Sequence, residues 1–451
     1  MSVLRYTQLD DVGGLPRHEL RHGRRLKSGG VLSGALHTLG YYSTDVCLGS
    51  PPRRYDLIID TGSSITAVPC SSCRACGTHH CGVGGRFDVR RSTTAKPVGC
   101  RSNPNLLCES CMSNLCSYSV HYTEGSAIKG HVVHDVAHFT RTGPTADDDV
   151  SLTLPVFFGC QTLETGMFYR QEADGILGLQ PPRSRSRVPS MLSSLAASSH
   201  SAVEAFSLCL SDASGLFLLG GAAQRRAQPN ALTLPMERGA KARYSLKLSA
   251  MRVSNAAPAN TTFRTLSLPP SAYSPTIVDS GTTFVYASSP LFRVLHNHIK
   301  SQAPELERVG NKVCAMLTPA RLAALPSLQM IFGERPATPL LIRPHQYMVE
   351  FPRRNGARGV FADPSKRNYC VAIFDNHGGG TVIGASIMRH REVVFDVRQA
   401  TITFADADCS TMSARSSHLQ RPFKFASCDP SSNSSAAAQS PLTAFKSLLS
   451  G

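Results

Sequence analysis

Two short stretches of the chain repeat one pattern, and this repeat constrains the fold more than any other feature. The first, LIIDTGSSITAVP, spans residues 57–69, and the second, TIVDSGTTFVY, spans residues 276–286. Each places a lone carboxylate, Asp60 or Asp279, after an apolar run and before a hydroxylated residue and a glycine. Downstream, each half carries an apolar pair followed by glycine, in DGILGL and TVIGASIM. Two similar halves, each with one carboxylate on a strand-to-loop turn, predict a pseudo-two-fold site where the halves meet.

The strand pattern predicts an all-β protein built from two lobes. Short runs rich in Val, Ile, Leu, Tyr and Phe are broken by Gly, Pro and Ser, and helical periodicity is scarce. The 451 residues, 41% of them hydrophobic, are enough for two or three domains. We expect an N-terminal lobe over residues 39–222 and a C-terminal lobe over residues 223–410. Residues 1–38 are interpreted as a basic arm or propeptide remnant, and residues 411–451 as a disordered tail.

The two acid turns suit a pair of carboxylates that share one proton. Glycine lets each turn approach the opposite acid, and the hydroxyl groups place donors beside it. Like charges that close cannot both ionise cheaply, so one pKa falls and the other rises. The ionised acid can then activate a water, and the protonated acid can donate to a carbonyl oxygen, which hydrolyses an amide without a covalent intermediate. The supporting turn residues are Thr61, Gly62, Ser63, Ser280, Gly281 and Thr282.

With these motifs, the chain resembles the pepsin-like aspartic endopeptidases over about residues 39–410. The resemblance implies a bilobal all-β fold with a cleft between the lobes, peptide or protein substrates, no cofactor and no metal. It also implies a β-hairpin flap over the cleft, with Tyr122 as the flap tyrosine and Gly125 in the turn that follows it. One departure concerns the support of that tyrosine. Pepsins usually carry Trp seven residues after the first acid, whereas this chain has Ala67 there and contains no Trp.

The 15 cysteines indicate an oxidising compartment. Eight of them fall in one insertion, where four disulfides are favoured over zinc ligation and the connectivity stays open: Cys70, Cys73, Cys76, Cys81, Cys100, Cys108, Cys111 and Cys116. This insertion resembles that of the plant nepenthesins and of plasmepsin V. The nepenthesin pattern implies two further pairs, Cys209 with Cys409 and Cys314 with Cys370. It leaves three cysteines unassigned, namely Cys47, Cys160 and Cys428.

A secretory location is expected from the cysteines, although the chain shows neither a signal-peptide core nor an apolar stretch long enough to span a membrane. The simplest expectation is that the given chain lacks its true N-terminus and perhaps a membrane anchor. The net charge of +16 lies mostly in irregular segments. Because no clustered patch on a known nucleic-acid module is visible, nucleic-acid binding is not expected. We expect a monomer.

Two segments resemble plasmepsin V and its apicomplexan relatives more than the nepenthesins: YTEGS at the flap, and FFGCQTLETGMFYRQEADGILGL over residues 157–179. This resemblance implies processing of secretory or exported proteins at sites where arginine precedes leucine by two residues. Glu124, in the flap turn, would favour arginine because a carboxylate pairs with guanidinium through two hydrogen bonds. Gln171 or Glu172 would assist. The alternative is that Glu124 is simply solvated at a hairpin tip.

Two other functions stay open at this point. The chain could be a pepsin-fold binding or inhibitor protein without catalysis, although proteins of that kind usually lose one acid motif and this chain keeps both. It could also use the Cys-rich insertion as a metal-binding interaction module on a protease scaffold. Zinc content and free thiols would separate that reading from a peptidase.

Overall fold

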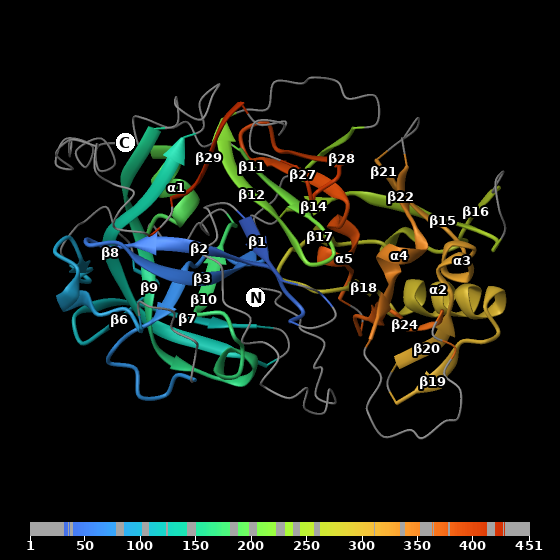
Figure 1. Cartoon of the computed structure of the whole chain (residues 1–451), viewed down its shortest axis with the longest axis horizontal. Helices are drawn as coiled ribbons and strands as arrows, with labels where there is room; N and C mark the ends of the chain where they lie inside the picture. The colour runs from blue at the N-terminus through green and yellow to red at the C-terminus, as the bar shows by residue number, and fades with distance from the viewer. Residues whose placement is uncertain are drawn as a thin grey trace.

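The computed structural model describes most of the chain between residues 31 and 428 (Figure 1). The described residues are 31–34, 36, 39–77, 85–101, 108–122, 125–141, 150–180, 188–197, 205–221, 231–237, 244–256, 262–310, 312–333, 339–351, 363, 365–377, 379–412, 420–426 and 428. Glu124 and Cys81 therefore lie outside them, as does most of the predicted arm over residues 1–38. The prediction of an arm is wrong for Val31–Ser33, because these residues form a strand, β1, that pairs with two strands of the large sheet.

The architecture is bilobal and all-β, as the sequence predicted. One 16-stranded sheet dominates the first half and reaches into the second. Its main path runs β13 (Leu232–Pro235), β28 (Thr401–Asp406), β27 (Arg391–Asp396), β11 (Ala205–Leu210), β12 (Ser214–Gly221), β1 (Val31–Ser33), β2 (Ser43–Leu48), β3 (Arg53–Asp60), β10 (Gly175–Gly178), β4 (Ala67–Pro69), β9 (Val150–Glu164), β8 (Ala127–Arg141), β7 (Leu115–His121) and β6 (Ser110–Met112). Two strands pair off this path, β5 (Lys96–Pro97) and β29 (Gln420–Phe425).

The second half contains three smaller sheets. The five-stranded sheet runs β14 (Ser245–Leu246), β17 (Thr276–Val278), β26 (Thr381–Ile383), β18 (Val285–Ala287) and β25 (Ile373–Asp375). One four-stranded sheet runs β16 (Phe263–Thr265), β15 (Leu248–Ser254), β21 (Leu328–Phe332) and β22 (Leu340–Ile342). The other runs β19 (Glu307–Val309), β20 (Lys312–Leu317), β24 (Arg367–Val371) and β23 (Met348–Glu350).

The helices are short and lie between strands. They are α1 (Met191–Ala197), α2 (Ser289–Gln302), α3 (Pro319–Ala323), α4 (Pro344–Tyr347), α5 (Ala385–Met388) and the 3₁₀ turns η2 (Val89–Arg91), η3 (Gly166–Tyr169) and η4 (Pro270–Ala272). The 14-residue helix α2 buries Leu291, Leu295 and Ile299, which recur every fourth residue and so share one face. Among the described residues, no helix is long and apolar enough to cross a membrane.

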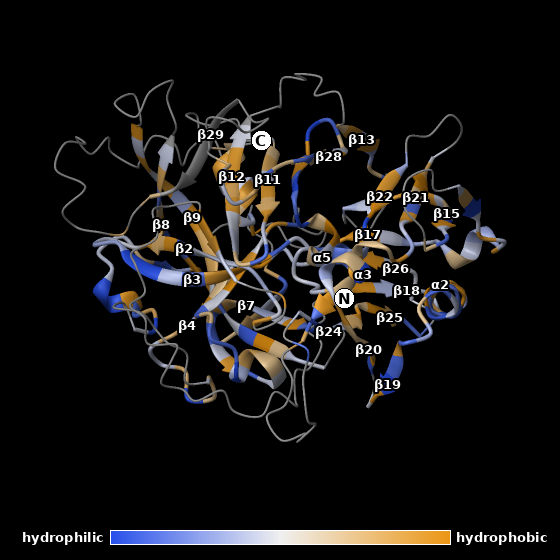
Figure 2. Ribbon diagram, turned by 45° about the vertical axis from the view of Figure 1, so that its right-hand side comes forward, coloured by the Kyte–Doolittle hydropathy of each residue, from blue (hydrophilic) through white to orange (hydrophobic). Residues whose placement is uncertain are grey.

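The apolar strands face inward, and their packing joins the two halves. Most central strands of the large sheet, such as β11 and β12, are strongly hydrophobic and buried (Figure 2). Strand β27, which comes late in the sequence, pairs with β11 in this sheet, and β28 pairs with the other edge of β27 (Figure 1). The predicted lobes are therefore not separate sheets, because the C-terminal block contributes three strands to the sheet of the N-terminal block.

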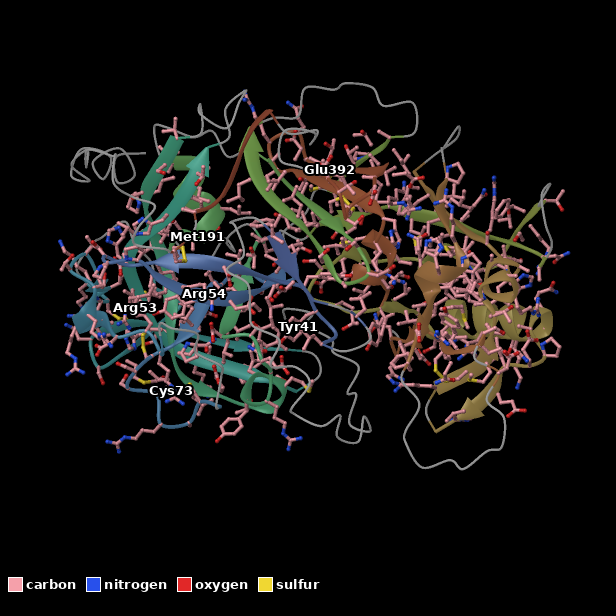
Figure 3. All side chains as sticks on the ribbon, in the orientation of Figure 1. Tyr41, Arg53, Arg54, Cys73, Met191 and Glu392 are labelled. Carbon is pink, nitrogen blue, oxygen red and sulfur yellow. A yellow bond between two sulfur atoms is a disulfide. The ribbon has the colours of Figure 1, made fainter. Side chains whose placement is uncertain are left out.

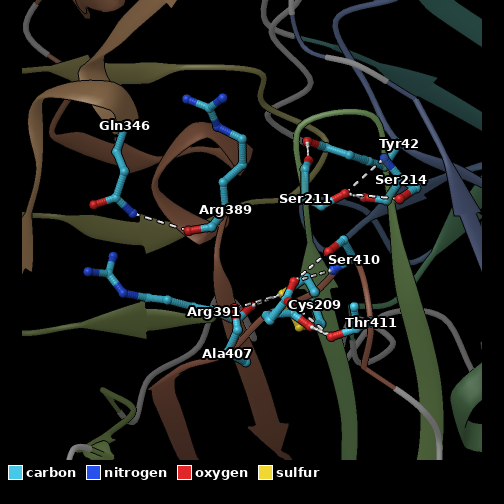
Figure 4. Close-up of a disulfide and its surroundings, with 12 residues drawn as sticks. Tyr42, Cys209, Ser211, Ser214, Gln346, Arg389, Arg391, Ala407, Ser410 and Thr411 are labelled. Atoms are coloured by element: carbon cyan, nitrogen blue, oxygen red, sulfur yellow. Dashed lines mark hydrogen bonds between the residues drawn. A yellow bond between two sulfur atoms is a disulfide. The ribbon is translucent and has the colours of Figure 1, made fainter. Parts of the chain in front are cut away.

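The disulfide between Cys209 of β11 and Cys409 also joins the two parts of the chain at this sheet (Figure 4). Beside it, the Arg389 guanidinium donates to the Asp212 carboxylate over 2.8 Å, across the same junction. Both contacts link the β11–β12 hairpin to the segment around β27. They indicate that the halves are held in a fixed relation around the site described below.

The predicted disordered tail is wrong for residues 420–426 and 428. Strand β29 pairs with β12 and β8, and Cys428 bonds to Cys47 of β2. The stretch QRPFKF alternates only over Phe423, Lys424 and Phe425 and contains Pro422, so its own strand signal was short. It forms because the edges of β12 and β8 offer unpaired backbone groups, and the disulfide fixes its end.

Seven disulfides join cysteines among the described residues. The two pairs implied by the nepenthesin pattern, Cys209–Cys409 and Cys314–Cys370, are both present. The expectation of four bonds closed within the insertion is wrong, because Cys70 bonds to Cys160 of β9. The other bonds in the insertion are Cys73–Cys76, Cys100–Cys111 and Cys108–Cys116.

The zinc alternative has little support from the described cysteines. One group of metal-type side chains, Cys70, Cys160 and His131, is close enough together to hold an ion. However, its two sulfur atoms are joined to each other as a disulfide. Zinc is bound by cysteine thiolates, which a disulfide does not offer.

Candidate active site

Asp60 and Asp279 stand at equivalent places in the two halves. Asp60 is the last residue of β3, and Asp279 directly follows β17. Each of these strands has a parallel neighbour from the downstream repeat: β10 beside β3 and β26 beside β17. The backbone N–H of Leu179 donates to the Asp60 carbonyl over 2.8 Å, and that of Asp279 donates to the Ile383 carbonyl over 3.0 Å. The downstream repeats thus hold the two acid turns in place.

The turns are locked together by reciprocal hydrogen bonds between Thr61 and Ser280. The Thr61 hydroxyl donates to the Val278 carbonyl over 3.2 Å and accepts from the Ser280 N–H over 2.9 Å. The Ser280 hydroxyl donates to the Ile59 carbonyl over 2.9 Å and accepts from the Thr61 N–H over 3.1 Å. All of these groups are buried away from water, so each would lack a hydrogen-bond partner without the opposite turn. The hydroxylated residue after each acid is therefore a structural link between the halves.

The turn glycines bring the two carboxylates close together. A Cβ on Gly62 would lie 2.6 Å from Asp279 Oδ2, and a Cβ on Gly281 would overlap the carboxylate of Asp60. Any larger residue would push the acids apart. The missing side chain of each glycine therefore leaves room for the opposite carboxylate. Both carboxylates lie fully buried, within hydrogen-bonding reach of each other.

Each carboxylate also receives two local hydrogen bonds. Gly62 N–H donates to Asp60 Oδ1 over 2.7 Å, and the Ser63 hydroxyl donates to Asp60 Oδ2. In the other half, Gly281 N–H donates to Asp279 Oδ1 over 2.9 Å, and the Thr282 hydroxyl donates to Asp279 Oδ2 over 2.9 Å. These donors fix the orientation of both carboxyl planes.

Burial and mutual repulsion separate the two acids electrostatically. Burial raises the pKa of Asp60 to about 6, although the hydrogen bonds from Ser63 and Gly62 act in the opposite direction. Burial, followed by the charge of Asp60, raises the pKa of Asp279 well above its usual range. A pair in this state holds one proton over a wide pH range. It can therefore offer an acid and a base side by side.

Tyr122 lies where the sequence placed the flap tyrosine, in the hairpin formed by β7 and β8. Its N–H donates to the Ser126 carbonyl over 2.9 Å, and the Gly125 N–H donates to the Tyr122 carbonyl over 3.1 Å. Gly125 has a φ of 96°, which favours glycine at this turn. The hairpin is therefore closed at the predicted point.

Phe168 of η3 supports the buried Tyr122 ring, a contact that the sequence did not reveal. The two ring centroids are 4.9 Å apart at an interplanar angle of 44°. Ala67, which stands where pepsins carry Trp, is buried in the same apolar cluster. A phenylalanine from a distant 3₁₀ turn thus packs on the tyrosine in a chain that lacks the tryptophan. The only sequence signal was that missing tryptophan, which required some other support.

Comparison with known proteins shows similarity over both halves of the chain, including the two acid turns. Two family models, described as xylanase inhibitor N-terminal and xylanase inhibitor C-terminal, match residues 42–221 and 243–406. The chain is 27% identical over 401 residues to aspartic protease 5 of Toxoplasma gondii, which covers 84% of this chain and 37% of that protein. It is 28% identical over 424 residues to aspartic proteinase 39 of Arabidopsis thaliana, covering 87% of this chain and 80% of that protein.

A third relative is plasmepsin V of Plasmodium falciparum, 30% identical over 190 residues. That match covers 42% of this chain and 31% of the plasmepsin. The chain thus spans only about a third of the length of two of these three relatives. The two family models together match most of the chain and each contains one acid turn.

The chain belongs to the pepsin-like aspartic protease family. The two residues predicted to assist substrate recognition, Gln171 and Glu172, lie just after η3 and just before the DGILGL repeat. The Gln171 amide donates to the Ala173 carbonyl over 3.3 Å, and its buried Oε1 has no hydrogen-bond partner among the described residues. Glu172 is exposed, and its backbone N–H donates to the Tyr41 hydroxyl over 3.2 Å. Gln171 therefore has a free acceptor, whereas the Glu172 carboxylate faces solvent.

Proposed function

We propose that this chain is an aspartic endopeptidase in which Asp60 and Asp279 form the catalytic pair. The observation that carries the proposal is the mutual approach of the two buried carboxylates, each across the glycine of the opposite turn. The family membership and the names of the relatives support the same activity. Both acid turns are intact, as catalysis requires.

In the proposed mechanism, Asp60 is the ionised acid and Asp279 the protonated one, in line with the order of their pKa values. Asp60 takes a proton from a water held between the carboxylates, and the oxygen of that water attacks the scissile carbonyl carbon. Asp279 donates its proton to the carbonyl oxygen, which gives a neutral tetrahedral diol. Asp60 then passes its proton to the amide nitrogen, Asp279 recovers a proton from the diol, and the carbon–nitrogen bond breaks. No covalent enzyme intermediate forms.

The deciding experiment is cleavage of a peptide library by the purified protein, alongside Asp60→Ala. We expect cleavage by the unchanged protein, competition by statine peptides, and loss of cleavage in the variant. Cleavage at the same rate by both proteins would exclude the proposed pair and indicate a contaminating peptidase.

A second candidate function is binding without catalysis, and one observation favours it: the matching family models are described as those of xylanase inhibitors. A binding protein would not need both carboxylates at this separation. If the unchanged protein cleaves no peptide but binds a xylanase, this second function is correct.

We further propose that the enzyme prefers arginine on the non-prime side of the bond, in secretory or exported proteins cut at Arg-x-Leu-like sites. The support is the resemblance to plasmepsin V, together with the Gln171 Oε1 near the flap support η3, which accepts no hydrogen bond within the described part of the chain. Glu124 would supply the charge, although it lies outside the described residues. The seven disulfides support a secretory or extracellular location.

A double-mutant cycle tests this preference, with an arginine peptide and its alanine twin on wild type, Glu124→Ala and Gln171→Ala. Truncating one partner of a buried charge pair commonly costs about 2–5 kcal/mol, so we expect Glu124→Ala to lose at least about tenfold for the arginine peptide alone. Gln171→Ala would remove one neutral acceptor for the guanidinium, a hydrogen bond worth about 1.5–3 kcal/mol, so its loss should be the smaller one. Glu172→Ala is tested beside them as the third candidate, and Glu307→Ala, at an exposed acid of β19 in the other half, is the control. An arginine preference that survives in all three candidate variants would exclude them as the recognising residues.

A further inference from the structure

The flap tyrosine is connected to the Cys-rich insertion through η3. On the flap side, the Ser126 hydroxyl accepts from the Met167 N–H over 2.9 Å. The Thr165 hydroxyl accepts from the Ala127 N–H over 2.8 Å, and the Thr165 N–H donates to the Ala127 carbonyl over 2.9 Å. The turn that carries Phe168 is thus tied to the base of the flap.

The opposite side of η3 rests on the loop closed by the Cys73–Cys76 disulfide. Gly77, which directly follows this loop, has no room for a Cβ because one would overlap the carbonyl of Tyr169. The Gly77 N–H donates to the buried Glu164 carboxylate over 3.0 Å, and the Glu164 N–H donates back to the Ala75 carbonyl over 2.8 Å. The end of β9 and the start of η3 are therefore set against this loop.

Arg86 fixes the loop from its other side. Its half-buried guanidinium donates to three backbone carbonyls, those of Cys73, Cys76 and Gly77, the last two over 3.1 Å each. A planar guanidinium offers several donors in a fixed geometry, which a lysine ammonium does not. Figure 3 shows Cys73 in the part of the first half that lies away from the second half.

We propose that the Arg86-bound loop, residues 73–77, is a positioning device for the flap tyrosine and acts through η3 and Phe168. The inference rests on the proposed function, because it assigns the loop to substrate handling by the flap. No side chain of the loop touches the catalytic pair. Its effect passes instead from Gly77 to the backbone of η3, from η3 to the Phe168 ring, and from that ring to Tyr122.

The geometry distinguishes this role from general stabilisation. A loop that only stabilised the insertion would need no contact with η3, yet Gly77 is packed too closely on Tyr169 for any side chain. Moving η3 by the width of a methyl group would shift Phe168 relative to Tyr122. Small displacements of groups that orient a substrate can cost up to about 100-fold in rate.

The test uses three variants of the full chain: Arg86→Met, Gly77→Ala and the double change Cys73→Ser with Cys76→Ser. Matched controls are Arg90→Met, whose guanidinium contacts only the Asp88 carboxylate among the described contacts, and Cys100→Ser with Cys111→Ser in the same insertion. For all three variants we expect kcat/KM to fall about tenfold or more, mainly through KM. Arg86→Met and the double cysteine change should keep a thermal midpoint close to that of their matched controls.

Amide hydrogen exchange at Tyr122 and Gly125 provides a second measurement that does not depend on activity. We expect exchange there to become at least about tenfold faster in the three variants, since the flap turn opens more often when its support moves. Equal exchange in variants and controls would overturn the proposal, as would a loss of activity through kcat alone. Arg86→Met leaves the loop backbone and its disulfide unchanged, so it keeps the test decisive if Gly77→Ala, whose methyl group meets the Tyr169 carbonyl, folds poorly.

The two proposals fail in different ways. If the unchanged protein cleaves no peptide, the proposed peptidase function fails, and hydrogen exchange still decides whether the loop controls the flap. If the protein is an active peptidase but all variants keep normal flap exchange and KM, only the positioning role is excluded. Arg86→Lys sharpens the reading: because an ammonium cannot reach three carbonyls in one plane, we expect it to restore little of the loss.

Discussion

Asp60 and Asp279 stand on turns of the same construction, set in different surroundings. Each turn follows an apolar strand, has a parallel neighbour from the downstream repeat, and gives its carboxylate one N–H and one hydroxyl donor. The first turn lies in the 16-stranded sheet, beside the flap hairpin and a cluster of disulfides. The second lies in a five-stranded sheet, where no described residue forms a comparable flap.

The comparison separates what the proposed chemistry needs from what the substrate needs. The repeated part supplies two carboxylates that share a proton, and both halves contribute to it equally. The unrepeated part, in the first half, covers one side of the pair with Tyr122 and its support. Even within the repeated part the acids differ, because burial raises the pKa of Asp60 to about 6 and the charge of Asp60 helps to raise that of Asp279 further.

The largest expected effect comes from removing either acid. Asp60→Asn and Asp279→Asn should each lower kcat by about a thousandfold or more, since general acid–base catalysis by a positioned side chain contributes about 10²–10⁴-fold and each acid serves two steps. Steady-state cleavage of one peptide by both variants measures this. Asp408→Asn, at an acid outside the site, is the control. A variant that keeps most of its activity would break the equivalence of the two halves.

The next effect tests the space above the turns. Gly62→Ala and Gly281→Ala each put a methyl group against the opposite carboxylate, so the acids must separate. We expect kcat to fall about 100-fold in both variants, because a displacement near 1 Å of a reacting group costs about that much. Gly333→Ala, at a turn with a φ of 69° and no atom within 4 Å of the added methyl, controls for the backbone strain of a lost glycine without a steric clash. Full activity in either variant would contradict the close approach.

Part of this site could be predicted from the sequence because it is local. The acid, the glycine and the hydroxyl group of each turn are consecutive residues, so their chemistry is visible without a structure. The hairpin around Tyr122 was visible for the same reason, as were two disulfides implied by a resemblance. The repeat further indicated that the halves face each other, although only the structure shows that Thr61 and Ser280 bond across the junction.

The remaining features depend on contacts between distant segments. Phe168 comes from a region without periodicity, and its role follows only from where η3 is placed. Cys70–Cys160 was missed because Cys160 lies far from the insertion in sequence, and many pairings are open to eight cysteines. Strand β29 forms at edges that other strands provide, and its own alternation, Phe-Lys-Phe, is too short to predict a strand. Each of these features is set by tertiary contacts rather than by the local sequence.

A smaller effect tests the link between the halves through stability. Thr61→Val and Ser280→Ala each remove a hydroxyl that makes two buried hydrogen bonds, one as donor and one as acceptor. Each should lower the free energy of unfolding by about 2 kcal/mol, since an unsatisfied buried group costs about 1–3 kcal/mol. Because the two hydroxyls bond to each other's backbone, the double variant should lose less than the sum. Denaturant unfolding measures all three, and strictly additive losses would show that the turns are independent.

The smallest effect is a shift in the pH profile of kcat/KM when the hydroxyl beside either acid is removed. Ser63 donates to Asp60 and Thr282 donates to Asp279, and a hydrogen bond to the charged form lowers a pKa. Ser63→Ala should therefore raise the pKa of Asp60 above about 6. The proposed base would then stay protonated to higher pH, so the acid limb of kcat/KM should move up and activity at low pH should be lost. Thr282→Val should raise the pKa of Asp279, which keeps the proposed acid protonated to higher pH and moves the alkaline limb up instead.

Each shift should be about one pH unit, because losing a hydrogen bond to a charged group costs about 1.5–3 kcal/mol and water recovers part of that cost. Ser249→Ala, at a hydroxyl outside the site, should move neither limb. If both variants move the same limb, the acids are not divided between the halves as proposed, and the shared proton belongs equally to both.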